Sequence, residues 1–359
     1  MLRFLKDKKT RSDFITYALV VIAFIVVQLL VGARMIPRSL QGQLVPITAY
    51  VVMALALNLV VGVAGDLSLG HAGFMSIGAF SGVVVTMSLA DAIPSDEVRL
   101  VLAIVVGAVL AAVFGFLIGL PVMRLQGDYL AIVTLAFGEI IKGIVSCLLV
   151  GWDKNGLHML FNLSGSLGVD DLHLAEGGFA IIKGAQGASG VDKVSTFVAG
   201  FVLIMVALVI VLNLVRSRTG RAIMAVRDNR IAAESTGISV MKYRMIAFVV
   251  SAALAGAAGA LFGGNFSQFG ASKFDFNTST LILVFVVLGG LGNMRGSIIA
   301  AAALTILPEA LRGLSDYRML VYALVLIIVM IVRNDTRLQA LFSRILPKRK
   351  QKEVATDAE

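Results

Sequence analysis

Cysteine is almost absent from this chain of 359 residues, and so are the residue patterns of most catalytic sites. The one cysteine, Cys147, lies inside an apolar run, which excludes an internal disulfide and a thiolate metal site. The three histidines, His71, His158 and His173, show no metal-ligand spacing. Neither a Gly-x-Ser-x-Gly nucleophile motif nor a phosphate-binding glycine loop ending in Lys-Ser/Thr is found. The sequence therefore predicts no metal site, no cofactor bound by this chain and no catalytic chemistry of its own.

Charged residues are also scarce, at 15% of the chain, against about 25% in an ordinary soluble domain. Hydrophobic residues make up 58% and gather in runs of about 20 residues, enough to cross a hydrocarbon core of ~30 Å. Backbone groups in lipid must be satisfied within each segment, so such runs predict helices rather than strands. We expect an all-α fold, a polytopic membrane helical bundle of about ten spans with glycine-rich breaks.

The predicted spans follow the apolar runs. They are residues 14–33, 44–63, 72–90, 99–122, 128–150, 195–215, 244–264, 277–292, 296–313 and 318–332. The first run is too long for a signal-peptide core and lacks a convincing small-x-small cleavage site, so we expect it to remain as an anchor. The predicted organisation is a basic N-terminus at 1–13, a transmembrane domain at 14–333 and a tail at 334–359.

Lysine and arginine collect in three segments, the N-terminus, the loop 216–244 and the tail from Arg333 to Lys352. Basic residues near span ends remain on the cytoplasmic side, and even numbers of predicted spans separate the three segments. Both termini are therefore expected in the cytoplasm. The loop 151–195, which is rich in acidic residues, is expected outside as the one candidate for an external subdomain. The net charge of +9 follows mostly from this topology and gives no nucleic-acid signal.

A glycine-rich stretch at 63–74 interrupts two apolar runs and contains Ser68, Gly70 and His71. Unwound backbone at membrane depth is tolerated only where protein or a water-filled cavity surrounds it. The stretch is either a break that lines a pathway or a tight turn at the membrane surface, and the sequence does not decide between them. A similar break at 289–296 could mark a weak internal duplication of the kind found in transporters.

Two ionisable residues, Glu139 and Lys142, lie three positions apart inside the fifth predicted span and so share a helical face. Ionisable groups at such a position are costly unless they face the protein interior or water, which makes function the default hypothesis. A structural ion pair explains them as well and is slightly favoured. Thr134 on the same span and Glu139 are counted with the first break as pathway candidates.

Small residues recur between 252 and 264, where Gly256, Gly259 and Gly263 are three and four positions apart. Such spacing lets a second helix approach closely. Packing between spans, or with a partner subunit, is a sufficient explanation.

The basic loop 216–244 has the pattern of short amphipathic helices. Ala222, Ile223 and Val226 can share one face, and Gly237 is placed to end a helix in a left-handed conformation. A helix lying on anionic lipid would also explain the arginines. However, the side chains around Glu234 are small, which favours insertion into a groove of a partner protein.

At these residues the sequence resembles a known family. Ala232, Ala233, Glu234 and the following Gly237 resemble the cytoplasmic coupling loop of ABC importer permeases, which lodges in a cleft of the ATP-hydrolysing subunit. Other stretches narrow the resemblance to LivM-type permeases of branched-chain amino acid importers, over roughly residues 44–333. These stretches are 57–62, 67–74, 119–135, 217–222 and 287–292. The chain departs from the family pattern at 152–156, where relatives usually carry a Gly-Gly-x-Asn-Gly-like element.

The resemblance implies an inner-membrane permease that pairs with a second, related permease, two ATPase subunits that bind the ATP and an external solute-binding protein. It assigns a role in ATPase coupling to Gly220, Arg221, Arg227, Asn229, Ala233, Glu234 and Gly237. Urea and short-amide importers use closely related permeases, so the solute stays open. The alternative from a different class is a stand-alone secondary carrier that uses Glu139 as a proton or ion site.

Overall fold

The computed structural model describes residues 8–311, except 34, 36, 126, 155, 163–167 and 176, together with a few residues between 317 and 327. The chain divides into two compact units, residues 1–306 and 307–359, and the first unit carries all the features discussed below. The predicted tail, the first seven residues and most of the tenth predicted span lie outside the described residues.

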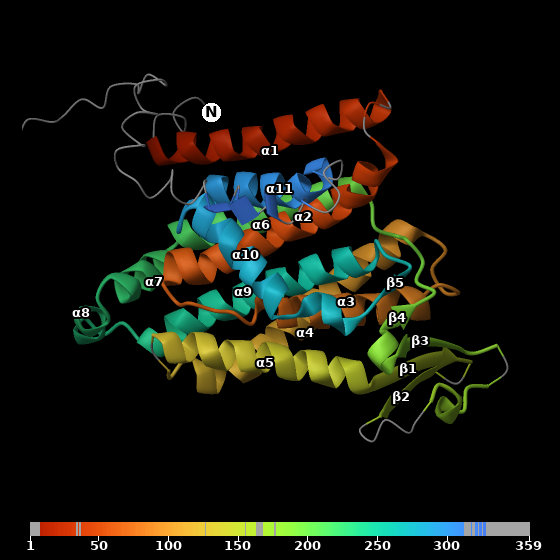
Figure 1. Ribbon diagram of the computed structural model, residues 1–359. Coiled ribbons are helices and arrows are strands. Elements are labelled where there is room, and N and C mark those ends of the chain that lie inside the picture. Colours follow the sequence, from red (N-terminus) through yellow and green to blue (C-terminus); the bar gives the residue numbers. More distant parts are fainter. Residues whose placement is uncertain are drawn as a thin grey trace, which may run out of the picture. The chain divides into compact units, whose positions relative to one another are not determined.

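The described residues are mainly helical, as predicted (Figure 1). The α-helices are α1 (Lys8–Gly32), α2 (Arg38–Asn58), α3 (His71–Ser88), α4 (Asp96–Val122), α5 (Asp128–Cys147), α6 (Phe197–Arg216), α7 (Arg218–Asp228), α8 (Arg230–Ser235), α9 (Val240–Gly263), α10 (Phe276–Gly289) and α11 (Met294–Ala310). Seven helical segments in this part of the chain are long and apolar enough to cross a membrane, and α10 is a shorter apolar helix. The predicted polytopic helical bundle is confirmed.

The centre of the bundle is built from α2, α3 and α9, most of whose residues are buried. Glycine allows these helices to touch. A Cβ on Gly259 would lie 2.0 Å from the carbonyl oxygen of Met75, and one on Gly78 would lie 1.9 Å from that of Gly256. The prediction that the small residues of 252–264 pack against another span is confirmed, because they receive the backbones of α3 and α4.

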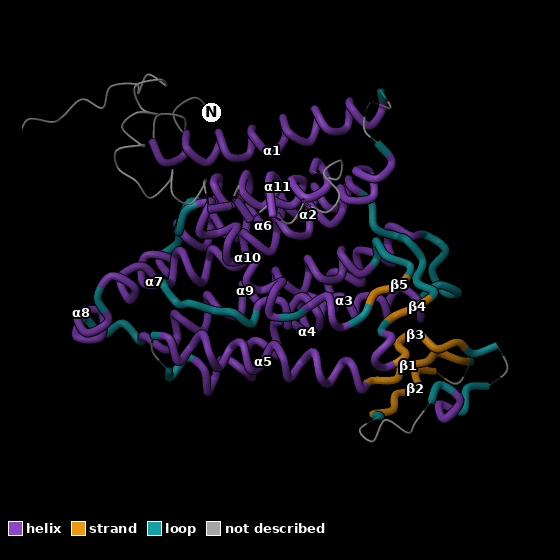
Figure 2. The backbone as a smooth tube through the Cα atoms, viewed as in Figure 1, coloured by secondary structure: helices purple, strands orange, loops and turns teal. Residues whose placement is uncertain are grey.

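The first glycine-rich stretch is not a tight turn. The helix α2 continues as a π-helix, η2 (Leu59–Ala64), which ends at Gly65 with a left-handed φ of 78°. Residues 65–70 then run without helical structure, and α3 begins only at His71 (Figure 2). Ser68 and Gly70 are buried, so the end of this segment is covered by other parts of the chain. The chain therefore contains a buried break between two helices.

A second short helix begins beside this break. After the strand β5 (Gln268–Phe269) and the 3-10 turn η5 (Ala271–Phe274), α10 starts with Asp275 as its cap, whose Oδ1 accepts from the backbone N–H of Thr278 at 3.0 Å. The backbone N–H of Ala72, in the first turn of α3, donates to the Oγ of Ser279, in the first turn of α10, at 3.1 Å. The amino ends of α3 and α10 therefore meet.

A small antiparallel sheet replaces the expected external loop and the end of the fifth span. Residues Leu148–Asp153 form β1, which pairs with β2 (Gly156–Phe161) and β3 (Phe179–Lys183); β4 (Ala188–Ser189) and β5 extend the sheet in the order β2-β1-β3-β4-β5. The predicted end of the span at residue 150 is therefore wrong, since α5 ends at Cys147. Hydrophobicity runs on unbroken from helix into strand, so composition alone could not locate this boundary.

The departure from the family pattern falls at the end of the β1–β2 hairpin, where Trp152 and Asp153 end β1 and Gly156 begins β2. Asp153, buried beneath it, holds the turn together. Its Oδ1 accepts from the backbone N–H of Gly156 at 3.1 Å, and its Oδ2 accepts from that of Ala175 at 3.0 Å. The ring of His158 lies 3.1 Å from the same carboxylate. This part of the chain is thus an ordered element with its own polar anchor.

Candidate functional site

The loop between α6 and α9 is an ordered helical element. Ser217 ends α6 and caps α7, because its Oγ accepts from the backbone N–H of Gly220 at 3.1 Å. A Cβ on Gly220 would lie 2.2 Å from the carbonyl oxygen of Leu214, so only glycine fits this bend. Arg221 is exposed and donates to the carbonyl oxygen of Arg216 at 3.2 Å. Gly220 therefore shapes the loop, whereas Arg221 lies on its surface.

The helix α8 is capped at both ends. The Oδ1 of Asn229 accepts from the backbone N–H of Ala232 at 3.0 Å, as an N-cap does. At the other end Gly237 has a φ of 82°, its N–H donates to the carbonyl of Glu234, and the N–H of Ile238 donates to that of Ala233. These two bonds form a Schellman motif. The prediction that Gly237 ends a helix in the left-handed conformation is confirmed.

The two helices of the loop have an inner and an outer face. Val226, Ala233 and Val240 form a buried cluster against which Ile238 packs, and Ala233 is only 4% exposed. The outer face of α8 consists of Ile231, Ala232, Glu234 and Ser235, all of them exposed. Ile231 is 81% exposed, which is a large apolar surface for the tip of a loop. Ala233 therefore supports α8 from within, while Glu234 lies on the outer face.

Arg227 joins the loop to the first break. Its Nη1 donates to the carbonyl oxygen of Gly62 at 3.0 Å, while its Nε and Nη2 donate to Asp228. Gly62 in turn touches the second break, since a Cβ on it would lie 2.2 Å from the backbone nitrogen of Gly292. Among the predicted coupling residues, Arg227 is thus the one that connects the loop to the end of η2, which in turn lies against the second glycine-rich stretch.

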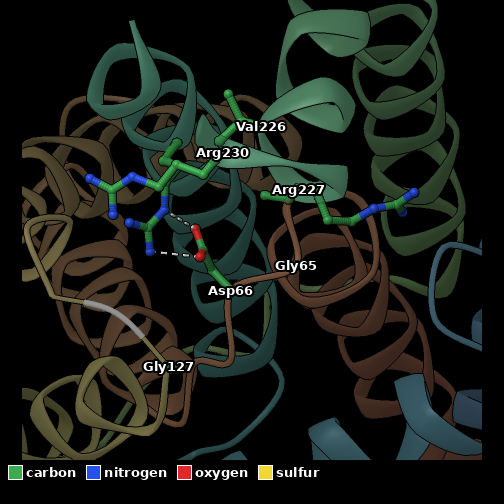
Figure 3. A pocket seen from close by; sticks show the side chains of 8 residues that line it. Gly65, Asp66, Gly127, Val226, Arg227 and Arg230 are labelled. Carbon is green, nitrogen blue, oxygen red and sulfur yellow. Dashed lines mark hydrogen bonds and ion pairs between the residues drawn. The ribbon is translucent and has the colours of Figure 1, made fainter. Parts of the chain in front are cut away.

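A buried ion pair that the sequence did not reveal lies beside Arg227. The Nε and Nη2 of Arg244 donate to the two carboxylate oxygens of Asp66 at 2.8 and 2.6 Å (Figure 3). The Nη1 of Arg244 donates to the carbonyls of Met123 and Leu125 at 3.0 and 3.3 Å. The side chains of Arg244 and Asp66 are only 8% and 12% exposed. An acid inside a break and an arginine at the start of a span were the signals that could have predicted it.

Inside the bundle, the break is held by neutral hydrogen bonds around His71, which is fully buried. The Oγ of Ser251 donates to the carbonyl of Ala56 at 2.5 Å, so it accepts from Nε2–H of His71 at 2.7 Å. The Nδ1 of the ring then accepts from the Oγ of Ser68 at 3.0 Å. Both ring nitrogens are satisfied within the chain, so Ser68 and His71 fix the break to α2 and α9.

Asn58, the last residue of α2 and fully buried, joins the end of this helix to the second glycine-rich stretch. Its Nδ2 donates to the Oγ of Ser297 at 2.9 Å, and its Oδ1 accepts from the backbone N–H of Gly292 at 2.8 Å. The second stretch therefore packs against the end of α2 and against η2, directly before the first stretch. This contact neither requires nor tests an internal duplication.

The break also rests closely on α5. The Oγ1 of Thr134 accepts from the backbone N–H of Leu69 at 3.1 Å and donates to the carbonyl of Ala131 at 2.9 Å. A Cβ on Gly70 would lie 2.2 Å from the carbonyl oxygen of Thr134. Thr134 is buried, so it anchors the break to α5.

Glu139 and Lys142 form the predicted ion pair, with 2.6 Å between Oε2 and Nζ. Their side chains are 40% and 30% exposed, and the charge of Lys142 also acts on Asp275, the cap of α10. Glu139 and Asp275 line one small cleft together with Leu69 and Ser279. Glu139 lies eleven residues into α5, about 16 Å along the helix, and therefore near the middle of the span. Charged side chains thus collect on one face near mid-depth.

Comparison with known proteins decides the family. Residues 39–330 match the model of the family described as branched-chain amino acid transport system, permease component. The chain belongs to this family. It is 33% identical, over 319 residues, to the high-affinity branched-chain amino acid transport permease LivM of Escherichia coli, covering 86% of this chain and 71% of that protein. The LivM resemblance read from the motifs is confirmed.

Two further relatives are named for different solutes, one for branched-chain amino acids and one for nucleosides. LivM of Salmonella typhimurium is 33% identical over 297 residues, covering 79% of this chain and 66% of that protein. The nucleoside ABC transporter permease NupC of Lactococcus lactis is 27% identical over 207 residues, covering 56% and 61%. No solved structure matches the chain. The family region contains both breaks and the loop, whereas α1 precedes it.

Proposed function

We propose that this chain is the membrane-spanning permease subunit of an ATP-driven importer for branched-chain amino acids and that it is not itself catalytic. Its two most similar relatives named above are LivM permeases, and the family is one of transport permease components. The observation that carries the proposal is the outer face of α8. A rigid, capped helix that exposes Ile231 beside Glu234 fits a docking surface for the ATPase subunits, which bind the ATP.

The contacts of the loop support a role in transmitting movement. The buried cluster below α8 makes the loop stiff, and Arg227 and Arg244 connect it to the first break at Gly62 and Asp66. ATPase closure would move α8, and these contacts would carry the movement to the helices that follow the break. A partner shifts a conformational equilibrium only through different contacts in the two states, so the outer face of α8 must be engaged differently in each.

The charged face near Glu139 supports a pathway shared with a second, related permease. Charged side chains in the middle of a span do not face hydrocarbon unpaired and mark pathways or protein contacts. The exposed side of α4, by contrast, carries Val105, Val109 and Val113, as a lipid-facing surface does. The face with Glu139, Lys142 and Asp275 would therefore be covered by the partner permease, with solute passing between the two.

The proposed orientation places the loop 216–244 and both termini in the cytoplasm. The sheet formed by β1 to β5 then lies outside, where an external solute-binding protein would dock. The membrane of this proposal is the cell (inner) membrane. The positive-inside rule supports this arrangement, since the basic residues of the sequence are concentrated in the two terminal segments and in the loop that contains α7 and α8.

Reconstitution tests the proposal. Proteoliposomes containing this chain, its related permease, the two ATPases and the binding protein should accumulate leucine only when ATP is supplied to the ATPases. Omitting the ATPases should abolish uptake, whereas a secondary carrier using Glu139 would continue and would follow the proton gradient. Competition by urea, short amides or nucleosides, instead of by valine and isoleucine, would reassign the solute while leaving the importer class intact.

A further inference from the structure

A small pocket lies between the coupling loop and the first break. Its volume is about 150 Å³. The residues that line it come from η2 and the break, the start of α5, the loop and α9; they are Ala64, Gly65, Asp66, Gly127, Val226, Arg227, Arg230 and Arg244. Figure 3 shows Arg230 on the same side of the pocket as the ion pair of Asp66, whereas the guanidinium of Arg227 points away. The volume is sufficient for a small oxyanion.

The pocket has an excess of positive charge. Three arginines line it against one carboxylate, that of Asp66, and both oxygens of this carboxylate are already bonded to Arg244. Asp228, outside the lining, pairs with Arg227. Asp128 follows Gly127 but is exposed and makes no cap to its own helix. The guanidinium of Arg230 is therefore left without a counter-charge at the pocket.

One nitrogen of the Arg230 side chain has no hydrogen-bond acceptor among the described residues. This nitrogen is Nη1, which is buried. A buried donor without an acceptor is destabilising, and more so when the group is charged. The position of Arg230 at the start of α8 is otherwise well ordered, because Asn229 caps that helix. An anion with more than one acceptor oxygen would satisfy this group.

We propose that this pocket binds an oxyanion of the phosphate type through Arg230. The planar guanidinium donates two parallel bonds to phosphate oxygens, and the neighbouring Arg244 adds favourable charge while remaining bonded to Asp66. The same chemistry is offered by inorganic phosphate and by the phosphodiester of a phospholipid headgroup at the cytoplasmic surface. Binding would join the first residue of α8 to the ion pair that holds the break.

A consequence for transport rests on the proposed function. An anion at this position would add a contact between the docking helix and the break beyond the bond from Arg227 to Gly62. Occupancy would therefore tighten the coupling between ATP hydrolysis and movement of the break. Binding of the anion itself does not depend on that function, so it can be tested without a transport assay.

The test is a thermal unfolding series on the full-length chain purified in detergent and washed free of lipid. Sodium phosphate should raise the Tm by about 2 °C over sodium chloride of equal ionic strength. The variant Arg230→Gln should weaken phosphate binding about tenfold or more and lose this increase. The control Arg218→Gln removes the same charge from an exposed position on the neighbouring helix and should keep it. Equal protection of Arg230→Gln and the unchanged chain would overturn the proposal.

The two sources of phosphate are separated in a second series in nanodiscs. If a headgroup occupies the site, phosphatidylglycerol should raise the Tm of the unchanged chain relative to Arg230→Gln, and added phosphate should have no further effect. If the ligand is a free anion, the increase should appear with phosphate in either lipid. The variant Arg230→Lys keeps the charge but cannot donate two parallel hydrogen bonds, so phosphate should raise its Tm less than that of the unchanged chain. No protection by phosphate or by lipid would reject the site.

Discussion

The coupling loop and the first break are neighbours in the structure and differ in how their polar groups are satisfied. In the break, Ser68 and His71 are buried and bonded within the chain. In the loop, the apolar residues beneath α8 are buried, while Glu234 and Ile231 are exposed. The break is thus complete without a partner, whereas the loop presents a surface that another protein can cover. Mutations in the break should act on folding, and mutations on the outer face of α8 should act on coupling.

The largest loss of stability is expected where the two regions meet, at the ion pair of Asp66 and Arg244. Replacing Asp66 by Leu leaves a buried guanidinium without its carboxylate, at a cost of about 3–5 kcal/mol. The amount of folded protein in the membrane should fall sharply, as measured by fluorescence-detected size exclusion. The exchange of both residues, Asp66→Arg with Arg244→Asp, should recover part of it. A normal yield of the single variant would show that the pair does not hold the junction.

A smaller loss is expected inside the break at Gly70. The substitution Gly70→Ala drives a methyl group into the carbonyl of Thr134, which is backbone and cannot rotate away. Overpacking of this kind costs about 1–3 kcal/mol, which should lower the Tm of the purified chain. The matched control is Gly143→Ala on α5, where nothing lies within 4 Å of the added Cβ and helix propensity favours alanine. Similar Tm values for both variants would contradict the close packing of the break on α5.

The smallest change in stability is expected at Glu234, on the outer face of α8. The substitution Glu234→Lys should alter the unfolding free energy by no more than about 0.5 kcal/mol, since the side chain is exposed. Uptake and stimulated ATP hydrolysis should nevertheless fall, because the reversed charge disturbs the docking surface. Asp91→Lys makes the same charge reversal at an exposed residue far along the chain and should leave both unchanged. Normal uptake by a fully expressed Glu234→Lys variant would remove α8 from the coupling mechanism.

Residues whose roles depend on local backbone geometry were predictable from the sequence. Gly237 follows a short amphipathic run, and the left-handed end of a helix needs little more than that context. The pairing of Glu139 with Lys142 follows from their spacing in a helix. The helical bundle followed from the apolar runs, although the last predicted span lies outside the described residues. Each of these predictions depends only on residues that are close together in the sequence.

Features that join distant segments were not predictable in this way. The pairing of Asp66 with Arg244 spans 178 positions, and the sequence around either residue does not indicate which residue it pairs with. The sheet begins at Leu148 within an apolar run that continues from α5, so its start carries no change of composition. The sequence did not show that Ala233 is buried. The helix α8 has only six residues, so a buried position and an exposed one can be direct neighbours in the chain, and the pattern is too short to tell them apart.

The π-helical stretch at Leu59–Ala64 sets the angular position of everything that follows it. A π-turn holds one residue more than an α-turn, so winding the same residues as an ordinary α-helix would rotate the residues that follow by about 100°. The side chain of Asp66 would then point away from Arg244, although the span would remain as apolar and almost as long. A change between the π and the α form at this point would therefore act as a rotary adjustment, changing which side of the molecule the acid faces without altering how the segment sits in lipid.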